Sequence, residues 1–426
     1  MFFSVPVHED KTETDGSLYT VYEIHVNGAV HSSARYGQLY KLNEQLQKRF
    51  DTTNLAEFPP KKLFSLSAFE KEERKALLEL YLQTIGQQPE ILKSNLFVDF
   101  LLQSQKDFNK LYDCDAVKLD VYQADRKITS VDINSSDYSL DVLHQTAASI
   151  GIDVKYHQYF ALYLMKKNDQ KMMKIIRKLQ DVECPYLALK SMDDLHSIEI
   201  RKTYWNTKID EELMKHNVTL HMLFIECIRN LEDRWIKPSA DTLKTLKQLK
   251  TAGLKEKFIR IVKSEYMYGY IQLASGNINY PDENKLVDVL VYAGSDKLRL
   301  EYGDGKTISL PIKRIKSWTL FVDKKDTLSI NYLVMKDVLK WVNISTSKSN
   351  VILISMALQS ILDELILLSD GLNSESPSFK ATNELLQMSG KNKKSRQDQN
   401  TRAPSFNALQ NQNNELFMEG INDDDL

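Results

Sequence analysis

Six strand-like segments followed by one long apolar segment occupy residues 284–369, and this succession constrains the fold more than any other feature of the chain. The segments read KLVDVLVYA, KLRLEYG, TISLPIKR, KSWTLFVD, LSINYLVM and VLKWVNIS, and the apolar run after them reads NVILISMALQSILDELILL. Short alternating runs between turn residues are typical of antiparallel strands, whereas the last run has the length of a helix. The pattern predicts an antiparallel sandwich closed by one C-terminal helix.

The middle of the chain shows two further patterns. From residue 116, VKLDVYQ and ITSVDIN predict strands, SLDVLHQTAASIGI predicts a helix, and FALYLMKK and further strands follow to about residue 205. This order is that of a ubiquitin-like roll. Residues 207–275 are predicted to be nearly all helical, with HNVTLHMLFIECIRNLEDRW and TLKTLKQLKTAGLKEKFIRIVKSEYM as long amphipathic runs.

The first 108 residues form another predicted unit. Residues 1–30 alternate as strands, and a helix is expected over residues 36–50 because Leu39, Leu42 and Leu46 recur at spacings of three and four. A proline-bearing loop, EFPPKKLFSLSAF, precedes two more helix-like runs, KEERKALLELYLQTIG and ILKSNLFVDFLLQSQ. The unit is expected to close near residue 108.

Composition excludes several classes of protein. A formal net charge of −2 argues against nucleic-acid binding, so any contact with an anionic membrane must come from a local patch. Three scattered cysteines indicate neither a disulfide framework nor a zinc site. No apolar run approaches the ~18 residues of a spanning helix, and the N-terminus lacks the pattern of a signal peptide. We therefore expect a cytoplasmic monomer without a cofactor or a metal.

After Asp370 the chain is rich in Ser, Asn, Gln and Lys, which predicts a disordered tail.

A cation and an aromatic ring, Arg35 and Tyr36, stand at the start of the first predicted helix. An arginine there suits an anionic ring ligand, because it can pair with a phosphate beside the positive end of the helix dipole while the aromatic ring packs under a sugar-like face. Lys62, on the stiff loop after two prolines, and Arg74, in the next helix, add two cations. Each of these charged residues could simply be solvated and have no role in binding. Their order along the chain favours a binding site.

Arg35-Tyr36, the Pro-x-Lys of residues 60–62 and Arg74 before LLELYL together resemble the phosphoinositide pocket of PX domains, over the whole of residues 1–108. The resemblance implies that Arg35 holds the 3-phosphate, that Tyr36 lies against the inositol ring, and that Lys62 and Arg74 meet the 1-phosphate and the 4- and 5-hydroxyls. Ala34 stands where many PX domains carry a second arginine, which implies a modest affinity. Leu63, Phe64 and Leu66 after the lysines either dip into the bilayer or pack on the domain itself, and the sequence leaves both readings open.

The rest of the chain extends the resemblance. A PX domain followed by ubiquitin-like, helical and pleckstrin-like units is similar to the PX-FERM sorting nexins, and FPPKKLFSL, IIRKLQDVECPY, RKTYW and EGINDDDL carry the likeness from end to end. The fold class implied is α+β multidomain, with a three-lobed FERM-like module and a tail. The predicted boundaries are 1–108 for the PX domain, 115–206 for the ubiquitin-like lobe, 207–275 for the helical lobe, 276–370 for the PH/PTB-like lobe and 371–426 for the tail.

Trp318 and the pair Leu362 and Ile366 are the predicted peptide-binding residues of the PH/PTB-like lobe. By themselves these residues favour a core role, because apolar helix stripes usually face inward. The resemblance instead implies that they line a surface between a strand edge and the last helix, which takes Asn-Pro-x-Tyr or Asn-x-x-Tyr/Phe tails of lipoprotein-receptor and integrin type. An extended peptide there adds main-chain hydrogen bonds to the strand edge.

Two short segments of the tail carry further expectations. The resemblance implies that Asp423, Asp424, Asp425 and Leu426 recruit the retriever complex, since acidic side chains, a free carboxylate and one apolar side chain suit a basic partner surface. Asn414 and Phe417 (NELF) fit the Asn-x-x-Phe form of a cargo ligand. A tethered self-ligand reaches a high effective concentration, so we expect NELF to compete with cargo.

No catalytic pattern emerges. GDGKT at residues 303–307 lacks the glycine that a phosphate-binding loop needs at position 300, where Leu300 stands, and it lies between two predicted strands. We therefore expect a protein that is not an enzyme. The resemblance implies an endosomal cargo adaptor, peripheral on the early endosome, that binds phosphatidylinositol 3-phosphate and links receptors to retriever. The alternative is a FERM-like scaffold for cytoskeletal or signalling proteins that reads no sorting signal.

Overall fold

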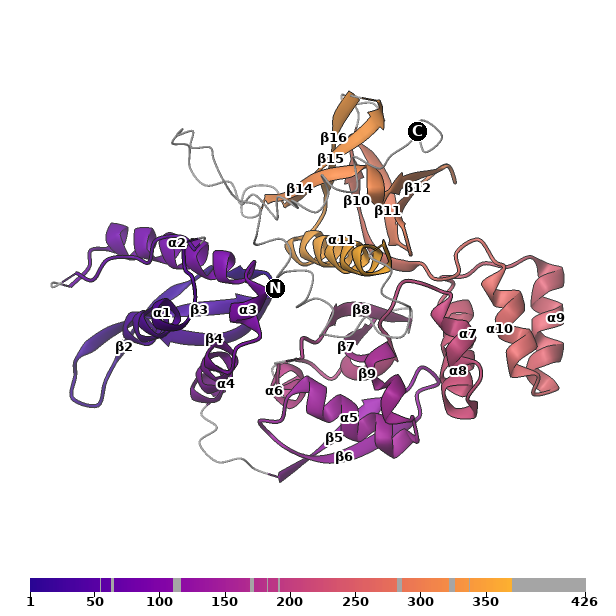
Figure 1. Cartoon of the computed structure of the whole chain (residues 1–426), viewed down its shortest axis with the longest axis horizontal. Coiled ribbons are helices and arrows are strands. Elements are labelled where there is room, and N and C mark those ends of the chain that lie inside the picture. The colour runs from indigo at the N-terminus through magenta and orange to yellow at the C-terminus, as the bar shows by residue number, and fades with distance from the viewer. Residues whose placement is uncertain are drawn as a thin grey trace. The chain divides into compact units, whose positions relative to one another are not determined.

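The computed structural model describes residues 1–53, 55–62, 65–109, 116–168, 172–181, 183–190, 192–281, 286–321, 326–336 and 338–369. The predicted tail and its residues Asn414, Phe417, Asp423, Asp424, Asp425 and Leu426 lie outside the described residues, as do Leu63 and Phe64. The chain divides into two units, one built mainly from residues 1–115 and the other from most of the remaining chain. Each unit is described by itself (Figure 1).

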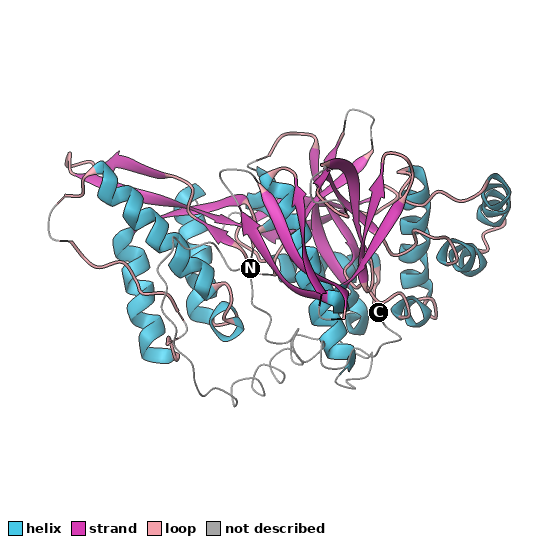
Figure 2. Ribbon diagram, turned by 90° about the horizontal axis from the view of Figure 1, so that it is seen from above, coloured by secondary structure: helices cyan, strands magenta, loops and turns pink. Residues whose placement is uncertain are grey.

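The N-terminal unit is a small sheet with helices on one side of it (Figure 2). Its strands and helices are β1 (Phe3–Ser4), β2 (His8–Thr12), β3 (Leu18–Val26), β4 (Ala29–Arg35), α1 (Tyr36–Arg49), α2 (Ala68–Ile85), α3 (Pro89–Leu92) and α4 (Asn95–Asn109). Strand β3 is central, since β1, β2 and β4 all pair with it. Asn27 and Gly28 join β3 to β4 with positive φ angles of 51° and 81°, as a type I′ hairpin turn requires.

The core of this unit confirms the predicted stripe of α1. Leu39, Leu42 and Leu46 are buried against apolar side chains of the sheet and of α2 and α4. The third predicted helix is in fact two, because Ser94 interrupts it: its hydroxyl accepts a hydrogen bond from the amide of Phe97 at 3.3 Å and so begins α4. Short helix α3 and long helix α4 therefore meet at a cap.

The ubiquitin-like lobe has the expected order of elements. They are β5 (Ala116–Tyr122), β6 (Ile128–Asn134), α5 (Ser139–Ile150), η1 (Val154–Tyr159), β7 (Phe160–Lys167), β8 (Met173–Lys178), α6 (Pro185–Lys190) and β9 (His196–Lys202). The sheet runs β6-β5-β9-β7-β8, with β5 and β9 parallel. The roll predicted from the sequence is confirmed.

The helical lobe consists of α7 (Ile209–Leu213), α8 (Asn217–Glu232), α9 (Ala240–Thr251) and α10 (Lys255–Lys263). One long helix was expected over the last two, but Gly253 separates them. Its φ of +70° is the left-handed conformation in which helices commonly end, and glycine adopts it without the steric penalty of a Cβ atom.

In its described residues the PH/PTB-like lobe has seven strands, one more than the six predicted segments. They are β10 (Ile271–Ile278), β11 (Val287–Ala293), β12 (Lys297–Tyr302), β13 (Thr307–Pro311), β14 (Ile315–Phe321), β15 (Thr327–Met335) and β16 (Val338–Ser345), with η2 (Ile312–Arg314) before β14 and α11 (Lys348–Ser369) at the end. The prediction that residues up to 275 are helical is wrong for β10. Gly276 lets β10 approach β16 closely, because a Cβ there would lie 2.6 Å from the carbonyl oxygen of Ser345. Such a pairing is non-local and leaves little trace in the segment itself.

Helix α11 corrects a second expectation. Its residues Lys348–Ile366 are long and apolar enough to cross a membrane, although the sequence was expected to contain no such run. The helix instead packs on strands β10, β11, β14 and β15 of its own lobe. Its apolar composition is that of a core helix that closes the sandwich.

Candidate functional site

The start of α1 carries the first predicted site residue. Arg35 is the residue before the helix, and its backbone N–H donates to the side-chain oxygen of Gln38 at 2.7 Å. A guanidinium group has no acceptor, so it cannot cap the first helical amides as Ser or Asp would. A Cβ built on Gly37 would meet no atom within 4 Å, which shows open space above this first turn. The positive end of α1 is therefore accessible to an anion.

Arg35 already has a carboxylate partner. Its Nη2 lies 2.6 Å from Oε1 of Glu13, and its guanidinium carbon lies 3.5 Å from the centroid of the Tyr19 ring. The hydrogen bond with Glu13 raises the pKa of Arg35 above its ordinary value. Glu13 therefore competes with any anion for this arginine, and Tyr19 packs against the guanidinium.

Tyr36, the first residue of α1, contacts Arg74 of α2. The guanidinium carbon of Arg74 is 4.1 Å from the centroid of the Tyr36 ring, and the Arg74 Nη2 donates to the carbonyl of Pro60 at 3.3 Å. The Tyr36 hydroxyl donates to the carbonyl of Pro59 at 2.9 Å. Burial raises the pKa of Tyr36, so this ring is a neutral donor at physiological pH. The loop that carries Pro59 and Pro60 is therefore hydrogen-bonded to Tyr36 and Arg74, two of the predicted binding residues.

Lys62 follows the same loop and is also paired. Its Nζ lies 2.7 Å from Oε1 of Glu70, and the other carboxylate oxygen accepts from the backbone amide of Ser67 at 2.8 Å. Lys62 and Ser67 together lower the pKa of Glu70 to about 2. Glu70 is therefore ionised throughout the physiological range and competes with a phosphate for Lys62.

Three residues of this site were not identified from the sequence. Glu13 follows β2 and Tyr19 lies on β3, and no pattern in the sequence indicates that they contact Arg35. Phe69 opens α2 after the lysine loop and is 78% exposed. It belongs to the apolar stretch LFSLSAF that was considered for bilayer insertion, and its exposure is what an inserting side chain requires.

The predicted peptide site lies where β14 meets α11. Strand β14 is the last strand in the sheet order of the described residues, and it packs against α11. Trp318 is fully buried, and its indole Nε1 donates to the hydroxyl of Ser355 at 2.9 Å. Leu362 is also buried, whereas Ile366 is half-buried. The structure therefore places Trp318 on β14 and Leu362 and Ile366 on α11, and it covers Trp318 and Leu362.

This placement changes the expected roles. Trp318 and Leu362 lie beneath the surface and support the strand edge from below, as the core reading of the sequence has it. Ile366 is the predicted residue that retains accessible surface for a peptide. Peptide binding by these three residues stays a prediction.

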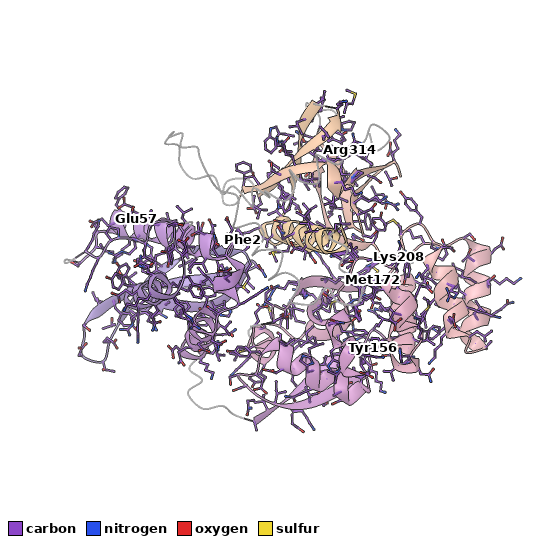
Figure 3. All side chains as sticks on the ribbon, in the orientation of Figure 1. Phe2, Glu57, Tyr156, Met172, Lys208 and Arg314 are labelled. Atoms are coloured by element: carbon purple, nitrogen blue, oxygen red, sulfur yellow. The ribbon has the colours of Figure 1, made fainter. Side chains whose placement is uncertain are left out.

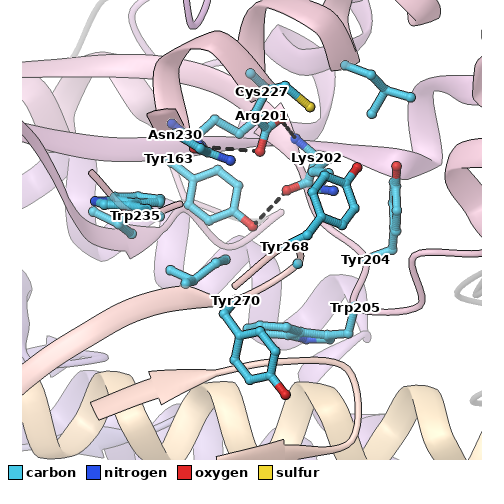
Figure 4. Close-up of a pocket in the computed structure, with 15 residues that line it drawn as sticks. Tyr163, Arg201, Lys202, Tyr204, Trp205, Cys227, Asn230, Trp235, Tyr268 and Tyr270 are labelled. Carbon is cyan, nitrogen blue, oxygen red and sulfur yellow. Dashed lines mark hydrogen bonds and ion pairs between the residues drawn. The ribbon is translucent and has the colours of Figure 1, made fainter. Parts of the chain in front are cut away.

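A network of buried charges joins the ubiquitin-like lobe to the helical lobe. Arg201 of β9 lies 2.9 Å from Oε1 of Glu199 and 3.2 Å from Oε1 of Glu226, and it donates to the amide oxygen of Asn230 at 3.2 Å (Figure 4). The cavity beside Arg201 has a volume of about 30 Å³, which is room for about one water molecule. The charges of this junction hold β9 to α8.

A second contact fastens α11 to the segment after β9. The backbone amides of Trp205 and Asn206 donate to the carboxylate of Glu364 at 2.8 and 2.5 Å, and the Trp205 indole donates to Ser360 at 3.0 Å. Burial raises the pKa of Glu364, while the two amides favour its charged form. The linker between the first two lobes is therefore bound to the third.

Comparison with known proteins assigns each part of the chain. Four family models match: the PX domain at residues 22–104, the sorting nexin 17/27/31 FERM F1 lobe at 117–205, the sorting nexin 17/31 FERM F2 lobe at 206–264 and the sorting nexin 17 FERM C-terminal domain at 269–366. Sorting nexin-17 of Danio rerio is 31% identical over 394 residues, which cover 87% of this chain and 82% of the relative. The chain belongs to the PX-FERM sorting nexins.

The chain is also similar to other proteins. Sorting nexin-31 of Homo sapiens is 28% identical over 323 residues, or 75% of this chain and 72% of that protein. The FERM and C-terminal domain complex of Drosophila Merlin aligns with a TM-score of 0.42 and 14% identity over 60% of this chain and 98% of its own. The four family models and the match to sorting nexin-17 confirm the resemblance and the fold class predicted from the sequence. As a sorting nexin, the chain combines a phosphoinositide-binding PX domain with a cargo-binding FERM module, two adaptor modules of endosomal transport.

Within the described residues, His, Cys, Asp and Glu form no group of three that could hold a metal ion.

Proposed function

We propose that this sorting nexin is an endosomal cargo adaptor that binds phosphatidylinositol 3-phosphate through Arg35, Tyr36, Lys62 and Arg74. The observation that carries the proposal is the arrangement at the start of α1, where Arg35 stands at the open, positive end of the helix and Arg74 lies over the Tyr36 ring. A phosphate on Arg35 gains charge-assisted hydrogen bonds and the helix dipole together. The protein is then peripheral on the cytoplasmic face of early endosomes.

The Arg35→Ala variant is expected to bind vesicles that contain phosphatidylinositol 3-phosphate about ten- to a hundred-fold more weakly. The reason is the loss of a charge-assisted contact worth about 1.5–3 kcal/mol. Arg49→Ala is the matched control, because Arg49 is a cation in the last turn of the same helix. Vesicle co-sedimentation measures both variants. Equal binding by Arg35→Ala and the wild type would place the pocket elsewhere.

The cargo site of this proposal is the outer edge of β14 beside α11. A strand edge offers unpaired main-chain groups, so an Asn-Pro-x-Tyr or Asn-x-x-Tyr/Phe tail of lipoprotein-receptor or integrin type can add to it as another strand. Trp318 and Leu362 form the buried support of this edge, and Ile366 contributes accessible apolar surface.

The Ile366→Asp variant is expected to bind an Asn-Pro-x-Tyr peptide at least ten-fold more weakly, because the peptide must desolvate the new carboxylate. Leu368→Asp is the matched control: Leu368 is exposed, and positions two apart on a helix face different directions. Fluorescence titration of the full chain, with an Asn-to-Ala peptide as the second probe, measures the effect. Wild-type affinity in Ile366→Asp, or equal binding of the two peptides, would favour the scaffold function instead.

The tail completes the proposal. The retriever complex binds the acidic end of the tail, which consists of Asp423, Asp424, Asp425 and Leu426. When cargo is absent, the NELF segment with Asn414 and Phe417 occupies the cargo site. Both roles rest on the sequence of the tail.

A further inference from the structure

Four large apolar side chains are exposed at the end of the hairpin formed by β15 and β16. Met335 is 60% exposed, Val338 39%, Leu339 40% and Trp341 49%. We call these four residues the apolar tip. Single exposed apolar residues are ordinary, but a contiguous group indicates a surface that meets a partner.

The strand register places the apolar tip on two neighbouring positions at the end of the hairpin. Leu339 and Trp341, two residues apart on β16, point to one face, whereas Val338 and its partner Met335 point to the other face. On the face of Leu339 and Trp341 the next pair is polar, since the hydroxyl of Ser329 donates to Asn343 at 2.6 Å. The end of the hairpin is therefore apolar on both faces, where a solvated hairpin would be polar.

Five cations lie on the segments of chain that form or adjoin the apolar tip. They come from two segments of the chain that meet there: Lys313, Arg314 and Lys316 before and within β14, and Lys336 and Lys340 on the hairpin. Arg314 (labelled in Figure 3) is fixed to the hairpin, because its guanidinium donates to the carbonyl of Leu333 at 2.9 Å and to that of Val334. In the sequence of residues 312–321 and 331–343, five cations stand against one carboxylate, that of Asp337.

We propose that the apolar tip is a second membrane contact, which inserts into the interface of an anionic bilayer. Tryptophan favours the level of the lipid head groups, the aliphatic side chains reach the acyl boundary, and each lysine or arginine near an anionic surface adds attraction. The cores of protein interfaces are instead depleted in lysine, and a second copy of this surface would bring like charges together.

This contact goes beyond the proposed phosphoinositide pocket and does not depend on it. The pocket recognises one head group, whereas the apolar tip recognises anionic charge and an apolar boundary in general. Two weak contacts on one chain strengthen membrane residence when both are engaged, because the second binds at the effective concentration set by the first.

Vesicles without phosphoinositide separate the two contacts. Full-length protein is titrated with phosphatidylcholine vesicles and with vesicles that also contain phosphatidylserine. We expect binding to the anionic vesicles, about ten-fold weaker binding of Trp341→Ser, and a comparable loss for Lys336→Glu with Lys340→Glu. Leu243→Ser is the matched control, because Leu243 is an exposed apolar residue of α9 in the helical lobe. If Trp341→Ser binds the anionic vesicles like the wild type, the proposal is wrong.

Iodide quenching of fluorescence reports the same contact directly. The difference between the wild type and Trp341→Phe isolates the emission of Trp341. We expect iodide to quench this emission in solution and anionic vesicles to protect it. Protection before any vesicle is added would show that another protein surface, from the tail or from a second copy, covers the apolar tip, and would overturn the proposal. The phosphatidylinositol 3-phosphate titration of Arg35→Ala is independent, so either site can fail alone.

Discussion

Trp318→Ala is expected to destabilise the PH/PTB-like lobe by about 3–5 kcal/mol, the usual loss when a large buried aromatic side chain is truncated. Trp318 is fully buried and its indole donates to Ser355, so the variant leaves both a cavity and a buried hydroxyl without its donor. Loss of peptide binding in this variant follows from loss of the supporting structure. Hydrogen exchange of the β14 and β15 amides, with denaturant unfolding, measures the effect.

Trp341→Ala is the matched control for this experiment. It removes the same side chain from the same lobe, but Trp341 is half exposed and lies on the solvent face of the sheet. We expect its free energy of unfolding to change by less than about 1 kcal/mol. A Trp318→Ala protein with wild-type stability and no peptide affinity would instead make Trp318 a direct ligand, as the sequence resemblance implied.

Arg201→Ala is expected to destabilise the C-terminal unit by about 3–5 kcal/mol, because it removes the cation that Glu226 contacts and leaves the buried Glu199 with Arg126 alone, at 3.8 Å. Arg201 contacts Glu199 on its own strand and Glu226 on α8, so the loss falls on the junction between lobes. Burial already raises the pKa of Glu199, and Arg201 opposes that rise. Without Arg201 the folded protein binds a proton more readily than the unfolded chain, so the destabilisation should shrink as the pH falls.

Arg260→Ala provides the comparison for Arg201. Arg260 also pairs with two carboxylates, those of Glu211 and Glu256, but it is 51% exposed. Solvent screens exposed ion pairs, so they contribute little to stability and this variant should be close to the wild type. Urea unfolding of both variants at pH 7.5 and pH 5.5 tests the reasoning, and equal losses in the two would contradict it.

Local periodicity was sufficient to predict most of the elements. The stripe of Leu39, Leu42 and Leu46 reports its own helix, because the period of 3.6 is a property of the segment itself. The same reasoning failed for β10, whose strand state comes from pairing with β11 and β16. Periodicity also predicted one continuous helix over α9 and α10. The sequence does not show that Gly253 takes the left-handed conformation, because glycine can adopt that conformation or a helical one.

For the candidate sites too, some features could be predicted from the sequence and others were decided by the tertiary structure. Residue types and their order along the chain were enough to propose Arg35, Tyr36, Lys62 and Arg74 and the PX-FERM family, because a motif is a local property of the chain. The tertiary structure alone decided that Glu13 and Glu70 already hold two of these cations. It also decided that Trp318 is covered while Trp341 is exposed, although both lie on strands of one sheet. Alternation tells which side chains share a face, but whether that face is covered depends on elements that arrive from elsewhere in the chain.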